Sequence, residues 1–215
     1  MIGRDGYMIP KKIHYCWFGK GKKSKLALKC IRSWRQYCPE YEVIEWNEEN
    51  FDIDMNGYTR MCYAEKKYAY LSDYVRLWVV EKYGGIYFDT DVEVIRSLEE
   101  LLRNDAFFCF ENKQYVASGL GFGSVAHGKV IQAMLKEYEI LLDGKNGVRM
   151  CPKLNTQALV ALGLKQNGRK QNVCEAVIYP MDVLNPYNSA TGKLEKTENT
   201  FSIQWYEATW MSKHL

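Results

Sequence analysis

Residues 72–91 constrain the fold of this chain more than any other segment, because several local patterns follow one another there without a break. The run 72–83 (SDYVRLWVVEKY) has apolar residues at helical spacing, and Ser72 is a suitable N-cap. Gly84-Gly85 is a typical helix stop, and the apolar tripeptide Ile86–Phe88 after it reads as a short buried strand. A helix that leads directly into a buried strand favours a fold in which helices cover a sheet.

The rest of the chain continues this alternation. Strands are expected at 9–18, 41–46, 86–88, 92–95, 107–110, 116–122, 177–179 and 201–205, and helices at 24–37, 72–83, 97–103, 128–142 and 156–164. In the helix 24–37 we expect Leu26, Ile31, Trp34 and Tyr37 to face inward. No repeat or linker divides the 215 residues, so we predict a single α/β domain over 1–215 with a central sheet flanked by helices.

Charge and composition narrow the function classes. Residues 1–40 carry ten Lys and Arg but only Asp5 and Glu40 as acids, which suits anionic phosphates or a membrane surface; a solvated basic loop is the alternative. No nucleic-acid reader motif accompanies these cations, so we expect no nucleic-acid partner. The seven cysteines include no C-x-x-C pair, which argues against a disulfide framework or a zinc site and favours a reducing, cytoplasmic environment.

Two D-x-D motifs are candidate metal sites. Asp52-Ile53-Asp54 lies in an acidic stretch without an apolar run before it, so we interpret it as a solvated loop. Asp89-Thr90-Asp91 follows a buried strand, and open α/β sheets bind ligands beyond the carboxyl ends of their strands. Two carboxylates there suit Mg²⁺ or Mn²⁺, and neither has a basic neighbour within three residues, so we expect two unpaired carboxylates that repel each other. A polar turn that binds backbone N–H groups is the alternative.

Asp73 and Arg76 are three residues apart and therefore share one helical face. A strand that runs back along this helix would bring Asp89 and Asp91 to the same end of it. The alternative is a local ion pair between Asp73 and Arg76.

The order S-D-x-x-R followed by Y-G-G-I-Y-F-D-T-D-V resembles the D-x-D glycosyltransferases of the Och1-like and capsular-polysaccharide group (glycosyltransferase family 32), and more distantly the glucosyltransferase domain of clostridial toxins. The segment 9–19 (IPKKIHYCWFG) is similar to the opening strand of that group, and 199–210 (NTFSIQWYEATW) to its closing segment. The resemblance implies a GT-A fold with a mixed, mostly parallel sheet, a nucleotide-sugar donor, a Mn²⁺ or Mg²⁺ cofactor and retention of anomeric configuration.

The resemblance also implies roles for individual residues. Asp91 would bind the metal, Asp89 the donor ribose or a metal-bound water, and Asp73 and Arg76 the hydroxyls of the transferred sugar. The remaining donor-site residues are Tyr15 and Trp17 near the base, Tyr87, and Trp210 with its indole N–H toward the diphosphate.

The chain departs from the group in two segments. Gln204-Trp205 stands where two histidines are common, so Gln204 is a weaker candidate metal ligand and Glu207 a nearby substitute. Cys151-Pro152 stands where the group has Gly-Pro. His127 is a candidate for facing the acceptor, with a capping or surface residue as the alternative.

We therefore predict a metal-dependent retaining transferase that moves a hexose from a nucleoside-diphosphate sugar, UDP-hexose before GDP-mannose, to a hydroxyl of a cell-surface glycan precursor, either a free or a lipid-linked glycan. Such an enzyme would be cytoplasmic, with transient contact to the inner face of the membrane. The alternative is a sugar-nucleotide-binding protein with weak or lost turnover. A D-x-D phosphatase is disfavoured, since those enzymes carry the motif on their first strand.

Overall fold

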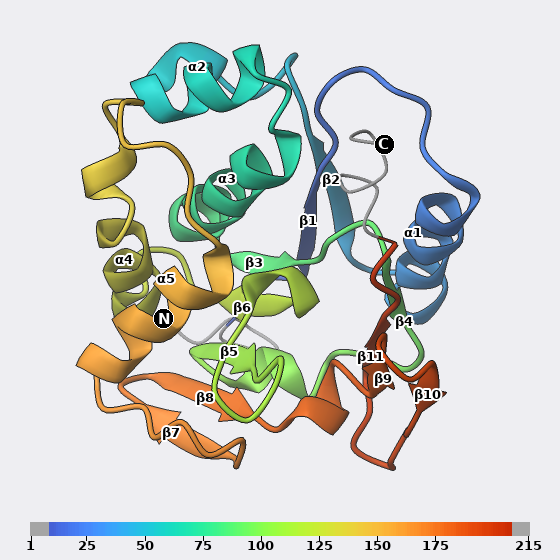
Figure 1. The fold of residues 1–215 in the computed structure, drawn as a ribbon. Helices are drawn as coiled ribbons and strands as arrows, with labels where there is room; N and C mark the ends of the chain where they lie inside the picture. The colour runs from blue at the N-terminus through green and yellow to red at the C-terminus, as the bar shows by residue number, and fades with distance from the viewer. Residues whose placement is uncertain (1–8, 208–215) are drawn as a thin grey trace.

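The computed structural model describes residues 9–207, and a seven-stranded sheet runs through the middle of this part of the chain. Its strands in chain order are β1 Lys12–Cys16, β2 Glu42–Trp46, β3 Gly85–Tyr87, β5 Ala106–Cys109, β6 Phe122–Ser124, β7 Gln171–Val173 and β8 Ala176–Tyr179. In space their order is β2-β1-β3-β6-β5-β8-β7 (Figure 1).

The directions in which the strands pair place several carboxyl-terminal strand ends along one edge of the sheet. β1 is parallel to β2 and to β3, and β5 is parallel to β8. β6 runs antiparallel between β3 and β5, and β7 is antiparallel to β8. Strands β1, β3, β5 and β8 therefore point the same way, and their carboxyl ends lie along one edge of a mixed sheet.

Helices cover both faces of the sheet. They are α1 Lys25–Tyr37, α2 Gly57–Ala64, α3 Tyr68–Tyr83, α4 Lys129–Lys136 and α5 Cys151–Ala161. Short 3-10 turns lie between them: η1 Ile53–Met55, η2 Leu101–Arg103, η3 Ser118–Leu120, η4 Glu139–Leu141 and η5 Met181–Val183. Figure 1 shows α2 to α5 on one side of the sheet and α1 on the other.

Two small sheets accompany α1. One pairs β4 Val92–Val94 with β11 Ser202–Gln204, and the other pairs β9 Tyr187–Asn188 with β10 Lys193–Leu194. β4 packs against α1, where the indole N–H of Trp34 donates to the Val92 carbonyl at 2.8 Å. This anchors the segment that follows Asp91 on the α1 side of the fold.

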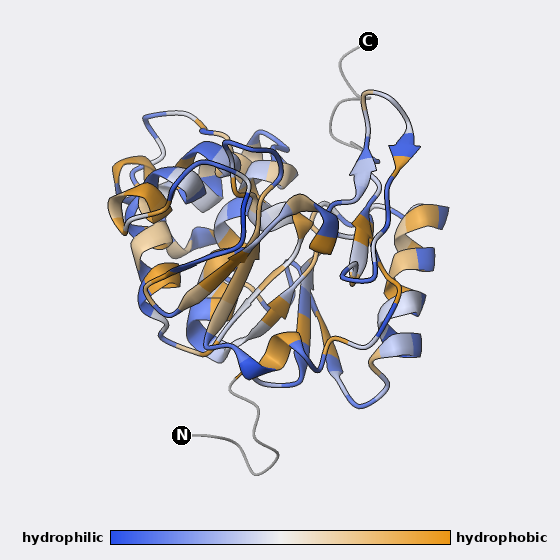
Figure 2. Ribbon diagram, turned by 90° about the horizontal axis from the view of Figure 1, so that it is seen from below, coloured by the Kyte–Doolittle hydropathy of each residue, from blue (hydrophilic) through white to orange (hydrophobic). Residues whose placement is uncertain are grey.

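The central strands are buried on both faces. Ile86 and Phe88 contribute to the apolar cluster on the α1 side, whereas Tyr87 between them contributes to the cluster under α3, α4 and α5, as the two-residue period of a strand requires. Phe107 and Phe108 divide between the two clusters in the same way. In Figure 2 hydrophobic residues accordingly gather on the inner strands and on the inward sides of the helices.

The N-terminal helix follows the sequence pattern closely. Ser24 caps α1, because its hydroxyl accepts the Ala27 N–H at 2.9 Å. Ile31 and Trp34 are buried as expected, whereas Tyr37 is 37% exposed and not inward, since it lies in the last turn beyond the contact with β4.

The helix before the D-x-D motif is longer than expected. α3 begins at Tyr68, so Ser72 lies inside the helix and is not its N-cap. Leu71 is fully buried and continues the apolar stripe that includes Val75. Packing of this extra turn outweighs the local capping preference of a serine.

The expected bounds of one strand and three helices were also wrong. Residues 116–122 form only an isolated bridge at Val116 and the turn η3, since glycines interrupt the run, and the strand β6 begins at Phe122. The expected helix 97–103 is reduced to η2, and the helix 128–142 ends as α4 at Lys136. α5 starts at Cys151, five residues early, because Pro152 fits a first helical turn.

Among the helices of residues 9–207, none combines the length and apolar character that a bilayer-spanning helix needs.

Candidate functional site

Three charged side chains meet at the carboxyl end of β3. The guanidinium nitrogen Nη2 of Arg76 lies 2.9 Å from Asp73 Oδ1 and 3.0 Å from Asp89 Oδ1. The side chains of Arg76, Asp73 and Asp89 are 4%, 13% and 28% exposed, so Asp89 is the member that solvent reaches most easily. The structure thus brings Asp73 and Arg76 of α3 to the D-x-D turn, and the pair is more than a local ion pair within one helix.

The Gly84-Gly85 stop makes this meeting possible. Gly84 has φ +62°, and a Cβ there would lie 2.9 Å from the Ala126 backbone nitrogen. The buried His14 ring fixes the same point, since its Nε2 lies 2.9 Å from the Gly84 carbonyl oxygen and its Nδ1 accepts the Trp46 indole N–H at 3.1 Å. The chain can therefore leave α3 and enter β3 within two residues.

Asp89 and Arg76 are held from several directions. The Tyr87 hydroxyl donates to Asp89 Oδ1 at 3.1 Å, and the Arg76 guanidinium lies 5.0 Å from the centre of the Tyr87 ring. On the other side, Arg76 Nη1 is 3.5 Å from the Ser118 hydroxyl and 3.9 Å from the Cys151 sulfur. Packing of this kind keeps a guanidinium in a fixed orientation.

Asp91 lies under the last described segment of the chain. The Glu207 N–H donates to Asp91 Oδ2 at 2.9 Å, the Trp205 N–H donates to the Asp91 carbonyl at 3.0 Å, and the Gln204 amide donates to the Asp91 carboxylate. Gln204 is 6% exposed, and no hydrogen-bond partner for its Oε1 exists within residues 9–207. The closing segment is therefore attached to the D-x-D turn, as the resemblance implied, through a glutamine.

Burial governs the ionisation of these groups. It raises the pKa values of Asp73, Asp89 and Asp91; Arg76 opposes the shift at Asp73 and Asp89, and the Cys151 thiol also opposes it at Asp73 by donating a hydrogen bond. Burial alone would lower the pKa of Arg76, but the charges of Asp89 and Asp73 hold it well above its ordinary value. The expectation of two unpaired carboxylates was wrong for Asp89, because its cation comes from a helix thirteen residues earlier in the chain.

The oxygen atoms around the D-x-D turn fit a hard divalent cation. Within residues 9–207, Tyr87 and Arg76 both donate to Asp89 Oδ1, which leaves Oδ2 available. Gln204 Oε1 is buried beside Asp91 without a partner. Residues 9–207 contain no group of three or more His, Cys, Asp or Glu side chains suited to a metal ion, so such an ion would need oxygen ligands from water or a phosphate.

Tyr15 and Trp17 have different surroundings. Tyr15 is 5% exposed, packs edge-on against Trp34 with ring centres 5.4 Å apart, and donates its hydroxyl to Glu45 at 2.5 Å. Trp17 is half-buried, its indole N–H donates to the Gly21 carbonyl at 2.7 Å, and the Lys23 ammonium lies 5.3 Å from its ring centre. Trp17 thus keeps part of its ring exposed, whereas Tyr15 is part of the core.

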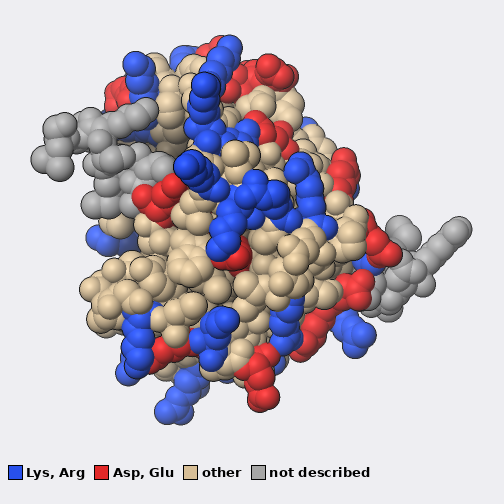
Figure 3. Space-filling view, turned by 90° about the vertical axis from the view of Figure 1, so that its right-hand side faces the viewer, with Lys and Arg blue, Asp and Glu red and all other residues tan. Residues whose placement is uncertain are grey.

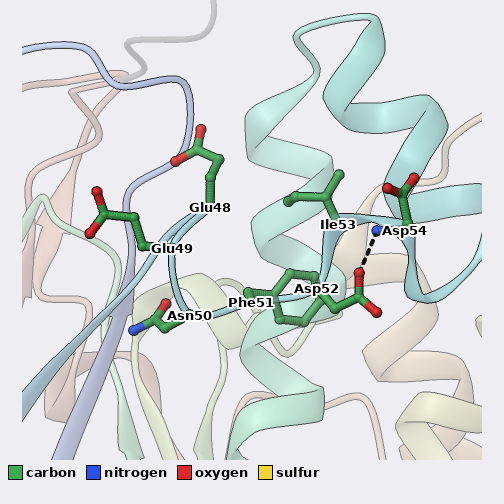
Figure 4. A pocket seen from close by; sticks show the side chains of 7 residues that line it. All are labelled: Glu48, Glu49, Asn50, Phe51, Asp52, Ile53 and Asp54. Carbon is green, nitrogen blue, oxygen red and sulfur yellow. Dashed lines mark hydrogen bonds between the residues drawn. The ribbon is translucent and has the colours of Figure 1, made fainter.

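The other D-x-D motif is a surface turn, as expected. Asp52 caps η1 by accepting the Asp54 N–H at 3.0 Å, and Asp54, 77% exposed, pairs with Arg60 at 2.9 Å. Figure 4 shows Asp52 and Asp54 in a hollow lined by 48–54, a segment that contributes no residue to the group of Arg76, Asp73 and Asp89.

One further candidate, His127, lies away from this group. His127 is a surface residue, 69% exposed, with its Nδ1 3.0 Å from Glu81. Trp210 lies outside the described residues.

The sequence did not predict the residues that contact Arg76 from η3 and α5. Ser118 and Gly119 come from the turn η3, which was expected to be strand, and Cys151 comes from the first turn of α5. The only sequence signal was the Cys151-Pro152 departure from Gly-Pro, and no spacing rule connects it to Arg76.

Known proteins resemble this chain in both sequence and fold. Residues 24–108 match the family model "Glycosyltransferase sugar-binding region containing DXD motif". The chain is 32% identical over 106 residues to inositol phosphoceramide mannosyltransferase 3 of Schizosaccharomyces pombe; the match covers 46% of this chain and 29% of that protein. The chain therefore spans less than a third of the length of this curated relative.

Two solved structures share the fold. The PaToxG glycosyltransferase superimposes with a TM-score of 0.57 at 18% identity, over 71% of this chain and 69% of that one. A glycosyltransferase involved in glycosylation of the major capsid of PBCV-1 gives 0.51 at 10% identity, over 89% and 92%. These likenesses confirm the expected GT-A fold, and with the family match they confirm the resemblance to D-x-D glycosyltransferases.

Proposed function

The chain has the GT-A fold and the D-x-D sugar-binding region of glycosyltransferases, and from this premise we propose that it transfers a hexose from a nucleoside-diphosphate sugar to a hydroxyl of a glycan, with retention of anomeric configuration. The observation that carries the proposal is the buried Arg76, which bridges Asp73 and Asp89 at the sheet edge where Asp91 also lies. A guanidinium fork beside two carboxylates is suited to binding neighbouring hydroxyls of a sugar ring.

In this proposal the residues of the chain divide the work. Asp73 and Arg76 orient the transferred sugar, Tyr87 fixes Asp89 through its hydroxyl, and Asp89 faces the donor. Trp17 is the residue that would lie against the nucleotide base. Orientation of this kind lowers the barrier because the reacting atoms are held close before the bond to the diphosphate breaks.

We also propose a divalent cation, Mn²⁺ or Mg²⁺, held by Asp91, Asp89 Oδ2 and Gln204 Oε1. The support is the oxygen-only donor set and the buried Gln204 oxygen that lacks a partner within residues 9–207. When bound, such an ion neutralises the charge that develops on the departing diphosphate. An amide oxygen is a weaker ligand than an imidazole for Mn²⁺, so we expect weak Mn²⁺ affinity without nucleotide and tighter binding in Gln204→His.

The identities of the donor and of the acceptor rest on fewer observations. The curated relative is named a mannosyltransferase, so a mannose donor stands beside the UDP-hexose favoured by the sequence. We propose a surface-glycan precursor, free or lipid-linked, as acceptor. A cytoplasmic location is supported by the cysteines, all seven of which are free.

A panel of UDP- and GDP-sugars tests the transferase. Thermal stabilisation and donor hydrolysis are measured with Mn²⁺ and with a chelator, for the wild type, Asp91→Asn and the matched control Asp54→Asn. We expect one donor to stabilise the protein by about 2.7 kcal/mol at a hundred times its dissociation constant. Asp91→Asn should abolish that binding and Asp54→Asn should not. Equal behaviour of the two variants, or transfer that survives the chelator, would contradict the metal site.

A sugar-nucleotide-binding protein without turnover is the second candidate, favoured by Gln204 in place of a stronger ligand. This candidate would be identified by a wild type that binds the donor without hydrolysing or transferring it, together with a Gln204→His variant that does turn it over.

We further propose contact with an anionic membrane surface through α1. Its exposed side carries Lys25, Arg32 and Arg35, together with Lys29, which pairs with Glu93 of β4 at 2.7 Å. The helix itself has no acidic residue, and the space-filling view from the α1 side shows Lys and Arg gathered there (Figure 3). Co-sedimentation with phosphatidylglycerol vesicles should fall for Arg32→Glu/Arg35→Glu and not for the α4 control Lys129→Glu/Lys136→Glu. Equal loss in both, or equal binding to phosphatidylcholine vesicles, would contradict this contact.

A further inference from the structure

A second carboxylate occupies a position equivalent to that of Asp89 on the same sheet edge. Asp89 lies two residues beyond the last residue of β3, and Glu111 lies two residues beyond the last residue of β5. Each is preceded by a fully buried phenylalanine, Phe88 or Phe110. Because β3 and β5 point the same way with β6 between them, both carboxylates leave the sheet at the edge where the candidate site lies.

The separation of these positions suits two reactants. Two strand spacings place the strand ends about 10 Å apart. Carboxylates that flank a sugar together with a water molecule lie roughly 6.5–9.5 Å apart in inverting glycosidases, which is the same scale. The edge therefore has room for a donor sugar beside Asp89 and for another group beside Glu111.

The backbone at Glu111 is fixed. Its N–H donates to the Tyr115 carbonyl at 2.8 Å, its carbonyl accepts the Asn185 side-chain amide at 3.1 Å, and a β-bridge joins Phe110 to Val116. In contrast, its half-buried carboxylate has no hydrogen bond or ion pair with any residue of 9–207. Burial without a compensating cation raises the pKa of Glu111.

Tyr206 connects this carboxylate to the D-x-D turn. The residues on either side of it, Trp205 and Glu207, both donate backbone N–H groups to Asp91, and Tyr206 itself has φ +52°, in the left-handed region. The Asn185 amide donates to its hydroxyl oxygen. After burial, the charge of Glu111 is the next largest cause that raises the pKa of the Tyr206 hydroxyl, and Asp91 adds to it.

Asn185 gives independent evidence that a hydrogen-bond donor is missing next to Glu111. It is 3% exposed, its amide nitrogen is used by Glu111 and Tyr206, and its Oδ1 has no partner within the described residues. A buried acceptor without a donor is costly, and so is a half-buried carboxylate without one.

We propose that Glu111, Asn185 and Tyr206 form the acceptor subsite of the enzyme and bind hydroxyls of a sugar. The inference rests on the proposed transferase function. Glu111 and Asn185 Oδ1 accept hydrogen bonds, and Tyr206 can donate one, so the complementary ligand presents several O–H groups close together. A phosphate would be repelled by Glu111, and an apolar acceptor would leave the Glu111 carboxylate and Asn185 Oδ1 unpaired.

The test separates donor from acceptor. Transfer to a panel of p-nitrophenyl hexopyranosides is measured for the wild type and Glu111→Gln with the donor found above, and the donor dissociation constant is measured by calorimetry with Mn²⁺. We expect Glu111→Gln to raise the KM of the accepted glycoside about ten- to a hundredfold, because a hydrogen bond to a charged group is lost. The donor dissociation constant should stay unchanged. Tyr206→Phe should raise the same KM with a smaller effect.

Asp182→Asn is the matched control, since Asp182 is also a half-buried carboxylate after β8 but already accepts the Thr197 hydroxyl at 2.8 Å. Its KM should not change. An unchanged KM in Glu111→Gln, or a donor dissociation constant that rises in parallel, would overturn the subsite. Donor hydrolysis by the wild type without transfer to any glycoside would overturn sugar hydroxyls as its ligand. If no donor binds or is hydrolysed at all, the transferase proposal itself fails.

Discussion

Gly119 lies so close to Asp89 that a Cβ at position 119 would come within 2.6 Å of Asp89 Oδ2 and 3.1 Å of Arg76 Nη1. Real Cβ atoms do not approach other atoms to 2.6 Å, so the carboxylate would have to move. Oδ2 is the oxygen of Asp89 that neither Arg76 nor Tyr87 uses. The turn η3 therefore needs a glycine because of the space it leaves for a carboxylate oxygen.

Gly119→Ala should displace Asp89 and weaken Mn²⁺-dependent nucleotide binding by at least about tenfold. Overpacking of this kind costs about 1–3 kcal/mol of folding stability. Calorimetric titration of donor nucleotide with Mn²⁺, with urea denaturation alongside, measures both effects. The control is Gly21→Ala, since no atom lies within 4 Å of the Cβ added there. Unchanged nucleotide binding in Gly119→Ala would show that Asp89 Oδ2 has no ligand-binding role.

Arg76 should be less replaceable than a surface arginine. Lysine can reach Asp73 or Asp89 but cannot bridge both with a planar fork, so Arg76→Lys should remove most turnover. Since the guanidinium is buried, this variant should also lose up to roughly 3–5 kcal/mol of stability. Asp73→Asn keeps the shape of the side chain, and it should lower turnover with a much smaller stability change. Donor turnover in Asp73→Asn equal to that of the wild type would reduce the pair to a structural ion pair.

Tyr15 in β1 and Trp17 just after it should have different roles. Trp17→Ala should weaken donor-nucleotide binding by about 1–3 kcal/mol, the value of one base–aromatic stack, with little change in stability. Tyr15→Ala should instead lower the free energy of unfolding by roughly 3–5 kcal/mol, because its ring packs against Trp34. Paired measurements of nucleotide affinity and urea midpoints distinguish them. Loss of affinity confined to the Tyr15 variant would contradict this division.

The part of the site that lies within one continuous segment was predictable from the sequence. Asp73, Arg76 and Asp89 follow from a helix, a glycine stop and a strand, and local patterns determine each of these. The first turn of α3 was missed, since Leu71 packs in the core and this packing outweighs the capping preference of Ser72.

The remaining parts of the site depend on contacts between distant segments. Arg76 meets Cys151 across 75 residues, and Glu207 meets Asp91 across 116. Glu111 carries no sequence motif, and its place beside the site follows only from the strand order β3-β6-β5. Spacing rules report helix faces and strand alternation, and they contain no information on which strands become neighbours.

His14 should make stability depend on pH through the junction of α3 and β3. Burial lowers the pKa of this imidazole from 6.5 to about 4, although the hydrogen bond to the Gly84 carbonyl opposes the shift. The folded state therefore favours neutral His14, and its contribution is complete above about pH 6.5 and is lost as the pH falls toward 4. From pH 7.5 to pH 5 this should remove about 2 kcal/mol of stability.

The measurement compares urea unfolding of the wild type and His14→Gln at pH 7.5 and pH 5. Burial raises the pKa values of Asp73, Asp89 and Asp91, which acts on stability in the opposite direction. These three groups are present in both proteins, so the difference in unfolding free energy between wild type and variant isolates His14. We expect the stability gap between wild type and variant to narrow at pH 5. NMR of the His14 ring nitrogens checks the cause, since the ring should still be neutral at pH 5. A protonated ring at that pH, or a gap independent of pH, would show that the contact with Gly84 does not depend on neutral His14.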